Sequence, residues 1–133
     1  MTLNYQDIEN AVNQEENAGG FALLIQRFKN LGVKRYDYFV EEGVYRYYDE
    51  NSTIDLRMNG VAKTVAEQPS ASGIKAAVTK AQAGMIDFEG FCQLAGKAGI
   101  SYWITDLEQM VVSYRDVKKN EILAEPIPLI TEQ

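Results

Sequence analysis

The side chains of this chain that could take part in catalysis or binding are one cysteine, an excess of carboxylates and a cluster of tyrosines. The 133 residues include no histidine, which excludes both a zinc site of cysteine and histidine and a catalytic triad with a histidine base. A lone cysteine also excludes a disulfide framework. Cys92 shares an apolar helical stripe with Phe88 and Phe91. We expect a buried, inert thiol there; the alternative, a nucleophile, needs an open electropositive setting.

Carboxylate pairs divide acid and base roles only where their surroundings push their pKa values apart. Glu41 and Glu42 fall in an expected exposed turn, which favours a solvated pair. Glu41 and Glu108 would be equivalent positions if the chain contains an internal repeat. The ten glycines show neither the Walker spacing nor the dinucleotide fingerprint. We therefore predict no catalytic residue, no metal ligand and no cofactor.

Tyrosine is the unusual residue, because five of the eight lie between positions 36 and 48. Strand alternation places Tyr36 and Tyr38 on one face, Tyr45 and Tyr47 on one face of the partner strand, and Tyr48 opposite. Such a face is either core beneath helices or an exposed recognition surface or pocket. In the second role, Tyr45 and Tyr47 would be exposed. The candidate binding residues are Tyr36, Tyr38, Tyr45, Tyr47, Tyr48 and Trp103.

Hydrophobic spacing predicts two helices and three strands in the first half of the chain. One helix starts behind Asn4 and stops at Gly19-Gly20, and a second runs from Phe21 to a capping Gly32. The strands are expected at residues 33–40, 44–49 and 52–58, with Gly43 taking the positive φ of a short turn. Near the end of the chain, residues 121–128 are expected to form a sixth strand.

The same order recurs after a polar linker at about residues 59–73. The offset that places Phe21 on Phe88 also matches Gly32 with Gly99, Tyr36 with Trp103, and Asp49 with Asp116. This predicts a duplicated α-α-β-β-β unit, at about residues 4–58 and 74–127, within one domain of residues 1–133. The alternative is that any two helix-hairpin units share a capping glycine and some aromatic residues. We expect an α+β fold with helices packed on a largely antiparallel sheet.

Charge and hydropathy limit the partners and the location. The net charge of −6 and the pI near 4.7 argue against a general nucleic-acid footprint. The amino terminus has neither the basic start nor the apolar run of a signal peptide. We therefore expect a cytoplasmic protein without a nucleic-acid or membrane partner.

Two stretches carry a family resemblance: FKNLGVKRYDYFVEEGVYRYYD and DFEGFCQLAGKAGISYWITDLEQMVVSYRD. Together they resemble the small uncharacterised bacterial and prophage proteins of the YbcV type, often labelled phage envelope protein. The shared motif positions are Tyr36, Tyr38, Phe39, Tyr47, Tyr48, Phe91, Cys92, Ala98, Gly99, Trp103, Asp106 and Leu107. The resemblance implies a bacterial or prophage-derived cytoplasmic protein. It implies no activity and no catalytic residue.

Two functions of different classes follow from these observations. The preferred one is a non-catalytic binding or regulatory protein, with a homodimer as one form, acting through the aromatic sheet face or the seam between the repeats. The alternative is a small enzyme or metabolite-binding domain in which carboxylates and tyrosines converge in that seam. A deep pocket with converging polar groups would favour the alternative. The partner, whether protein or small molecule, is not determined by the sequence.

Overall fold

The structure, a computed structural model, describes residues 21–50, 52–57 and 60–127. The helix expected at residues 4–18 lies outside this range. The described chain is an α+β fold, as predicted. Its helices are α2 (Phe21–Asn30), α3 (Ala71–Gln82) and α4 (Phe88–Lys97). Its strands are β1 (Arg35–Phe39), β2 (Val44–Tyr48), β3 (Thr53–Leu56), β4 (Tyr102–Asp106), β5 (Val111–Arg115) and β6 (Glu121–Pro126).

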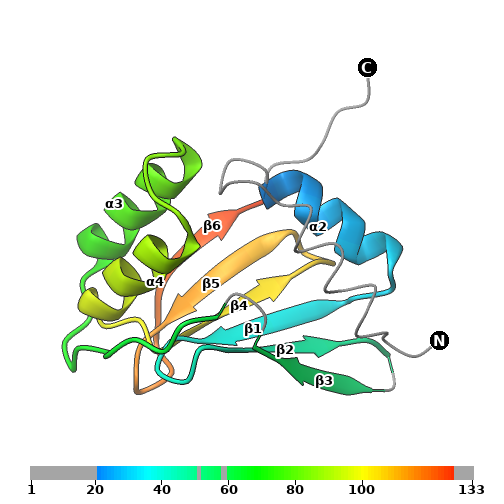
Figure 1. Ribbon diagram of the computed structural model, residues 1–133, viewed down its shortest axis with the longest axis horizontal. Coiled ribbons are helices and arrows are strands. Elements are labelled where there is room, and N and C mark those ends of the chain that lie inside the picture. The colour runs from blue at the N-terminus through cyan, green and yellow to red at the C-terminus, as the bar shows by residue number, and fades with distance from the viewer. Residues whose placement is uncertain (1–20, 51, 58–59, 128–133) are drawn as a thin grey trace.

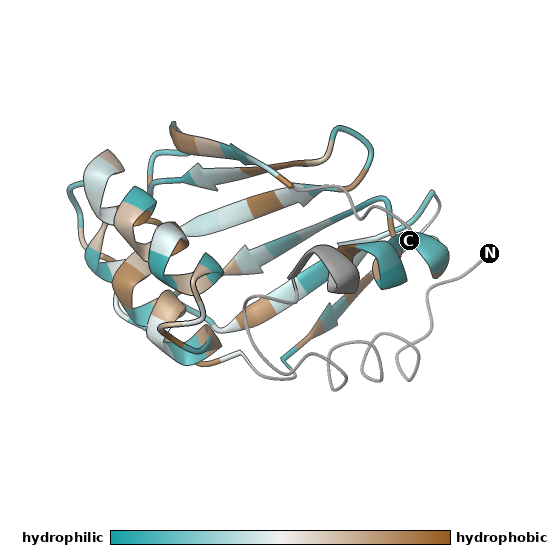
Figure 2. Ribbon diagram, turned by 90° about the horizontal axis from the view of Figure 1, so that it is seen from above, coloured by the Kyte–Doolittle hydropathy of each residue, from teal (hydrophilic) through white to brown (hydrophobic). Residues whose placement is uncertain are grey.

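The six strands form one antiparallel sheet in the order β3-β2-β1-β4-β5-β6. The three described helices lie on the same face of this sheet, with α2 over one part and the α3–α4 pair over another (Figure 1). Seen from above, the α3–α4 pair lies at one end of the sheet and α2 lies toward the other (Figure 2). The core therefore lies between the sheet and its helices.

The two helix ends named by the sequence analysis have the same backbone geometry. Gly32 has φ 92° and Gly99 has φ 77°, a left-handed conformation that glycine adopts without a Cβ clash. The Val33 N–H donates to the Phe28 carbonyl at 3.0 Å, and the Ile100 N–H donates to the Ala95 carbonyl at 3.0 Å. Both helices thus end in the same glycine cap.

Backbone hydrogen bonds beside the central strands are related in pairs. The Val40 N–H donates to the Ser101 carbonyl at 2.9 Å, and the Leu107 N–H donates to the Lys34 carbonyl at 3.1 Å. The two donors, Val40 and Leu107, are separated by the same offset as the two acceptors, Lys34 and Ser101, and as Phe21 and Phe88. The halves differ at the last turn, where a register shift lies between Tyr114 and Arg115. These relations support a duplication, which itself stays a prediction.

The expected linker ends earlier than predicted, because α3 already begins at Ala71. Ser70 caps this helix, since its side-chain oxygen accepts a hydrogen bond from the Gly73 N–H at 3.0 Å. The last strand likewise ends at Pro126 rather than at residue 128. Both differences are boundary corrections set by a cap and by a proline, which lacks a donor.

Residues 60–70 form a segment that leads from the sheet to α3 and passes along α4. Its Lys63 N–H donates to the Val40 carbonyl at 3.0 Å, and its Ala66 N–H donates to the Gly96 carbonyl at 2.9 Å. A Cβ built at Gly96 would overlap the carbonyl oxygen of Thr64 in this segment. Glycine is therefore required in α4 so that the segment can lie against the helix backbone.

We predict that Gly96→Ala lowers the free energy of unfolding by about 1–3 kcal/mol, because the clashing atom belongs to the backbone and cannot rotate away. Urea unfolding measures this change. Gly90→Ala is the matched control in the same helix, because its nearest neighbours are side-chain atoms of Asp87 and Ile86 at 3.2 and 3.3 Å. Equal stability of both variants would contradict the close packing at Gly96.

Candidate functional site

The tyrosine-rich face is the covered face of the sheet. Tyr36, Tyr38, Tyr45 and Tyr47 are each at most 6% exposed. They meet directly across the first hairpin, where Tyr36 pairs with Tyr47 and Tyr38 pairs with Tyr45. The structure therefore places these residues in the first of the two expected roles, the core. An exposed surface at Tyr45 and Tyr47 is wrong, because helices cover both residues.

Aromatic residues of the helices provide this cover. The Phe28 ring of α2 meets the Tyr47 ring edge-on at 5.3 Å between centroids. The Phe88 ring of α4 stacks on Tyr45 at 5.8 Å. Trp103 joins the same layer, stacked on Tyr38 at 4.8 Å, and is 5% exposed. Offset and edge-to-face ring contacts of this kind stabilise a core beyond simple burial.

Two buried hydroxyls on this face differ in their partners. The Tyr38 hydroxyl accepts a hydrogen bond from the Val61 N–H at 3.2 Å. The Tyr47 hydroxyl is buried and has no hydrogen-bond partner among the described residues.

Tyr38 also lies beside Cys92, which is fully buried, as predicted. Burial raises the pKa of the Cys92 thiol to about 12, and its inertness remains a prediction.

Burial also raises the pKa of the core tyrosines. The pKa of Tyr45 lies well above its ordinary value, first because of burial and then because of the neighbouring Tyr47 and Tyr36 hydroxyls. Burial is the first cause at Tyr38 and Tyr114 as well. These hydroxyls are therefore poor proton donors at neutral pH, which disfavours acid–base chemistry in the core.

The opposite face, called the open face below, is not covered by any described helix (Figure 1). Its centre is Asp37, which is only 4% exposed. The carboxylate accepts two hydrogen bonds from Arg35, from Nε at 3.0 Å and from Nη2 at 2.9 Å, and one from the Tyr48 hydroxyl at 3.0 Å. This bidentate pair raises the pKa of Arg35. A buried charge is compatible with the fold here because it is paired and hydrogen-bonded.

Arginines lie on aromatic rings across the open face. The Arg35 guanidinium lies 4.6 Å from the Tyr48 ring centroid, and the Arg46 guanidinium lies 5.3 Å from that of Phe39. Arg46 also pairs with Asp55 at 2.8 Å. The Phe39 ring stacks on Tyr102 at 5.9 Å, which joins β1 to β4. The first half of this face is thus a connected layer of rings and guanidinium groups.

The second half of the open face has a smaller polar network. The Ser113 hydroxyl donates to the Glu121 carboxylate at 2.7 Å and accepts from Arg115 Nε at 2.9 Å. Ile104 lies between this network and Asp37, because it pairs with both Asp37 and Ser113 in the register. By strand alternation the open face comprises Arg35, Asp37, Phe39, Val44, Arg46, Tyr48, Thr53, Asp55, Tyr102, Ile104, Asp106, Val111, Ser113, Arg115, Glu121, Ala124 and Pro126.

The carboxylates singled out in the sequence do not join the tyrosines. Glu41 and Glu108 are exposed and lie in the β1–β2 and β4–β5 turns. These turns are at opposite ends of the sheet, because β1 and β4 are antiparallel. The two residues therefore do not form a shared acid–base pair in a seam between the halves.

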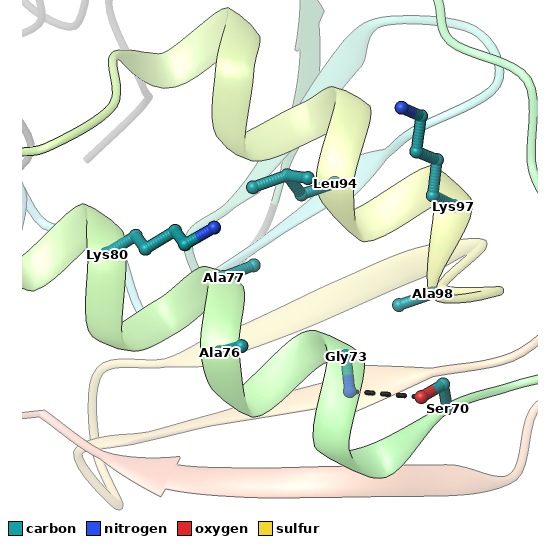
Figure 3. Close-up of a pocket in the computed structure, with 8 residues that line it drawn as sticks. All are labelled: Ser70, Gly73, Ala76, Ala77, Lys80, Leu94, Lys97 and Ala98. Carbon is teal, nitrogen blue, oxygen red and sulfur yellow. Dashed lines mark hydrogen bonds between the residues drawn. The ribbon is translucent and has the colours of Figure 1, made fainter.

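A pocket of about 280 Å³ lies between α3 and α4. Small and apolar residues form most of its lining, and Lys80 and Lys97 are exposed at its rim (Figure 3). The Ser70 oxygen is already the acceptor that caps α3. Reactive polar side chains do not converge in this pocket, and we assign no chemistry to it.

The described residues contain neither a metal-binding cluster nor a membrane-spanning helix. Within residues 21–50, 52–57 and 60–127, no three histidine, cysteine, aspartate or glutamate side chains are grouped so that they could hold a metal ion. In the same part of the chain, no helix has the length and apolar character needed to cross a membrane.

The sequence analysis did not identify the main residues of the open face. Tyr48 was a candidate, but Arg35, Asp37 and Arg46 were not. A signal was present, because Arg35, Asp37 and Phe39 alternate with the tyrosines of β1. Alternation assigns such residues to the face opposite the tyrosines, where a bidentate arginine–aspartate pair can form.

Comparison with known proteins finds a family to which no activity is assigned. Residues 9–126 match the family described as "Protein of unknown function (DUF1398)". The chain belongs to this family. No curated protein matches the chain.

We predict opposite effects for two matched hydroxyl deletions. Tyr38→Phe should lower the free energy of unfolding by about 1–3 kcal/mol, because the Val61 N–H loses its acceptor. Tyr47→Phe should leave stability unchanged or raise it, because the removed hydroxyl has no described partner. Urea unfolding of both variants measures the difference. A similar loss in both variants would contradict this hydrogen-bond assignment.

We also predict that the protein loses stability as pH rises above about 10, the ordinary tyrosine pKa. The core tyrosines stay protonated in the folded chain but ionise in the unfolded chain above pH 10. Their contribution to the free energy of unfolding is therefore fully present below pH 10 and declines above it. Each such tyrosine lowers the free energy of unfolding by about 1.4 kcal/mol per pH unit in this range. Urea midpoints between pH 8 and about 11 measure the slope. A flat profile would contradict the burial of these hydroxyls.

Proposed function

We propose that this chain is a non-catalytic protein-binding module that acts through the open face. The observation that carries the proposal is the layer of aromatic rings and arginines at Phe39, Tyr102, Arg46 and Tyr48. Aromatic residues and arginine are enriched at protein interfaces, while lysine is depleted, and the described strands place no lysine on this face.

The face is suited to binding because its side chains are already fixed. Asp37 holds Arg35 and Tyr48 by three hydrogen bonds, and Asp55 holds Arg46. Association with a prearranged surface loses less side-chain entropy than association with a mobile one. The proposed binding surface is thus the open face of β1 and β2, and not the tyrosine-rich face that the sequence suggested.

The proposal includes the biological origin of the protein and its cellular location. The YbcV-type motifs support a bacterial or prophage protein with a cytoplasmic location. The exposed and separated carboxylates at Glu41 and Glu108 favour binding over catalysis in the seam.

We predict that a photo-reactive phenylalanine analogue at Tyr102 cross-links to protein in the native host. The same analogue at Met85 is the control, because Met85 is 71% exposed and lies in the helical layer between α3 and α4. Mass spectrometry of the products identifies the partner, including a second copy of this chain. Equal cross-linking at both positions, or none at Tyr102, would contradict the proposed binding face.

A further inference from the structure

We infer that the partner of the open face is the same face of a second copy of this chain. This inference rests on the proposed function and adds the identity of the partner. In the proposed homodimer, the two sheets pack with their strands aligned, and the two-fold axis runs along the strands between β1 and β4. Aligned packing at about 30° is a common arrangement of two sheets.

The register of the central strands determines which residues meet across such an axis. Phe39 pairs with Tyr102 along one row of the sheet, and Arg35 pairs with Asp106 along another. An axis between β1 and β4 exchanges the two members of each row. Phe39 of one copy then faces Tyr102 of the other, and Arg35 faces Asp106, so that each contact forms twice.

A different axis gives poorer complementarity. An axis across the strands would place Arg35 of one copy over Phe39 of the other, and Asp106 over Tyr102. The Asp106 carboxylate would then meet a ring rather than a cation. Charge complementarity therefore selects the arrangement with aligned strands, because desolvated charges need opposite charges.

The charge of the face also favours a second copy over an unlike partner. The described strands place three arginines and four carboxylates on it, namely Arg35, Arg46, Arg115, Asp37, Asp55, Asp106 and Glu121. A strongly acidic or strongly basic surface would meet like charges there. An identical face instead supplies both signs, and the aligned arrangement brings Arg35 opposite Asp106 twice.

The size of the face predicts a reversible dimer. Six strands at about 4.8 Å spacing and five residues at about 3.3 Å give a footprint of roughly 500 Å². A standard interface buries about 800 Å² of accessible surface on each partner. The open face is therefore near the lower limit for a stable pair, and the dimer should dissociate on dilution.

The first test is sedimentation velocity over a concentration series. We expect the wild-type chain to show a monomer–dimer equilibrium. Ile104→Glu should raise the dissociation constant by at least about tenfold, because it places a charge at the centre of the interface. Met85→Glu is the matched control outside the face and should sediment like the wild type. A monomeric wild type, or a dimer unaffected by Ile104→Glu, would overturn the inference.

The second test measures the arrangement without changing the centre of the face. A spin label at Thr53→Cys lies on the edge strand β3, and Cys92 is buried away from the reagent. Aligned strands place the two labels near opposite edges, at roughly 24 Å or more, which is five strand spacings. A much shorter distance would overturn the proposed axis.

Sedimentation and the cross-linking at Tyr102 together separate this inference from the proposed function. A wild-type monomer that still cross-links to another protein through Tyr102 would reject the second copy and retain the binding face. A wild-type monomer that cross-links to nothing at Tyr102 would reject both. A dimer that cross-links to itself at Tyr102 and not at Met85 would support both.

Discussion

The strict alternation of β1 is the constraint on which the rest of the structure depends. Tyr36 and Tyr38 point into the core, while Arg35, Asp37 and Phe39 point to the open face. A slip by one residue would bury the charged set beneath the helices and expose the tyrosines. Because β1 pairs with both β2 and β4, its register also aligns the two halves of the sheet.

Burial on the covered face and order on the open face are linked through the same strand. Helical phenylalanines fix the tyrosines from one side, and Asp37 fixes Arg35 and Tyr48 on the other. A buried carboxylate with three hydrogen bonds holds its partners in one geometry, because breaking them would leave a charge unsatisfied. The resulting surface is ordered by its own side chains, although none of the described helices lies above it.

Much of the local structure could be predicted from particular residues. Gly32 and Gly99 mark helix ends because both take a left-handed conformation, and Gly43 marks the first hairpin with φ 69°. Ile74, Ala77 and Val78 recur at helical spacing and form the buried stripe of α3. Local conformational preferences determine these features, so that the nearby sequence contains the required information.

The position of the site could not be predicted in the same way. Alternation separates the two faces of β1 and β2 but does not say which face α2 and α4 will cover. That choice depends on long-range contacts such as Phe88 with Tyr45, and on the pairing of β1 with β4. The Asp37 network differs in this respect, because Arg35 and Asp37 lie on one strand and the predicted hairpin brings Tyr48 to Asp37.

Chemical modification of the tyrosines, mapped by mass spectrometry at low protein concentration, tests the central claim most directly. If one sheet face is core and the opposite face is available for binding, Tyr48 and Tyr102 should react in the folded protein. Tyr36, Tyr38, Tyr45 and Tyr47 should react only after unfolding, because they are at most 6% exposed. Rapid modification of Tyr45 or Tyr47 in the folded chain, with Tyr48 and Tyr102 protected, would contradict this assignment of the two faces.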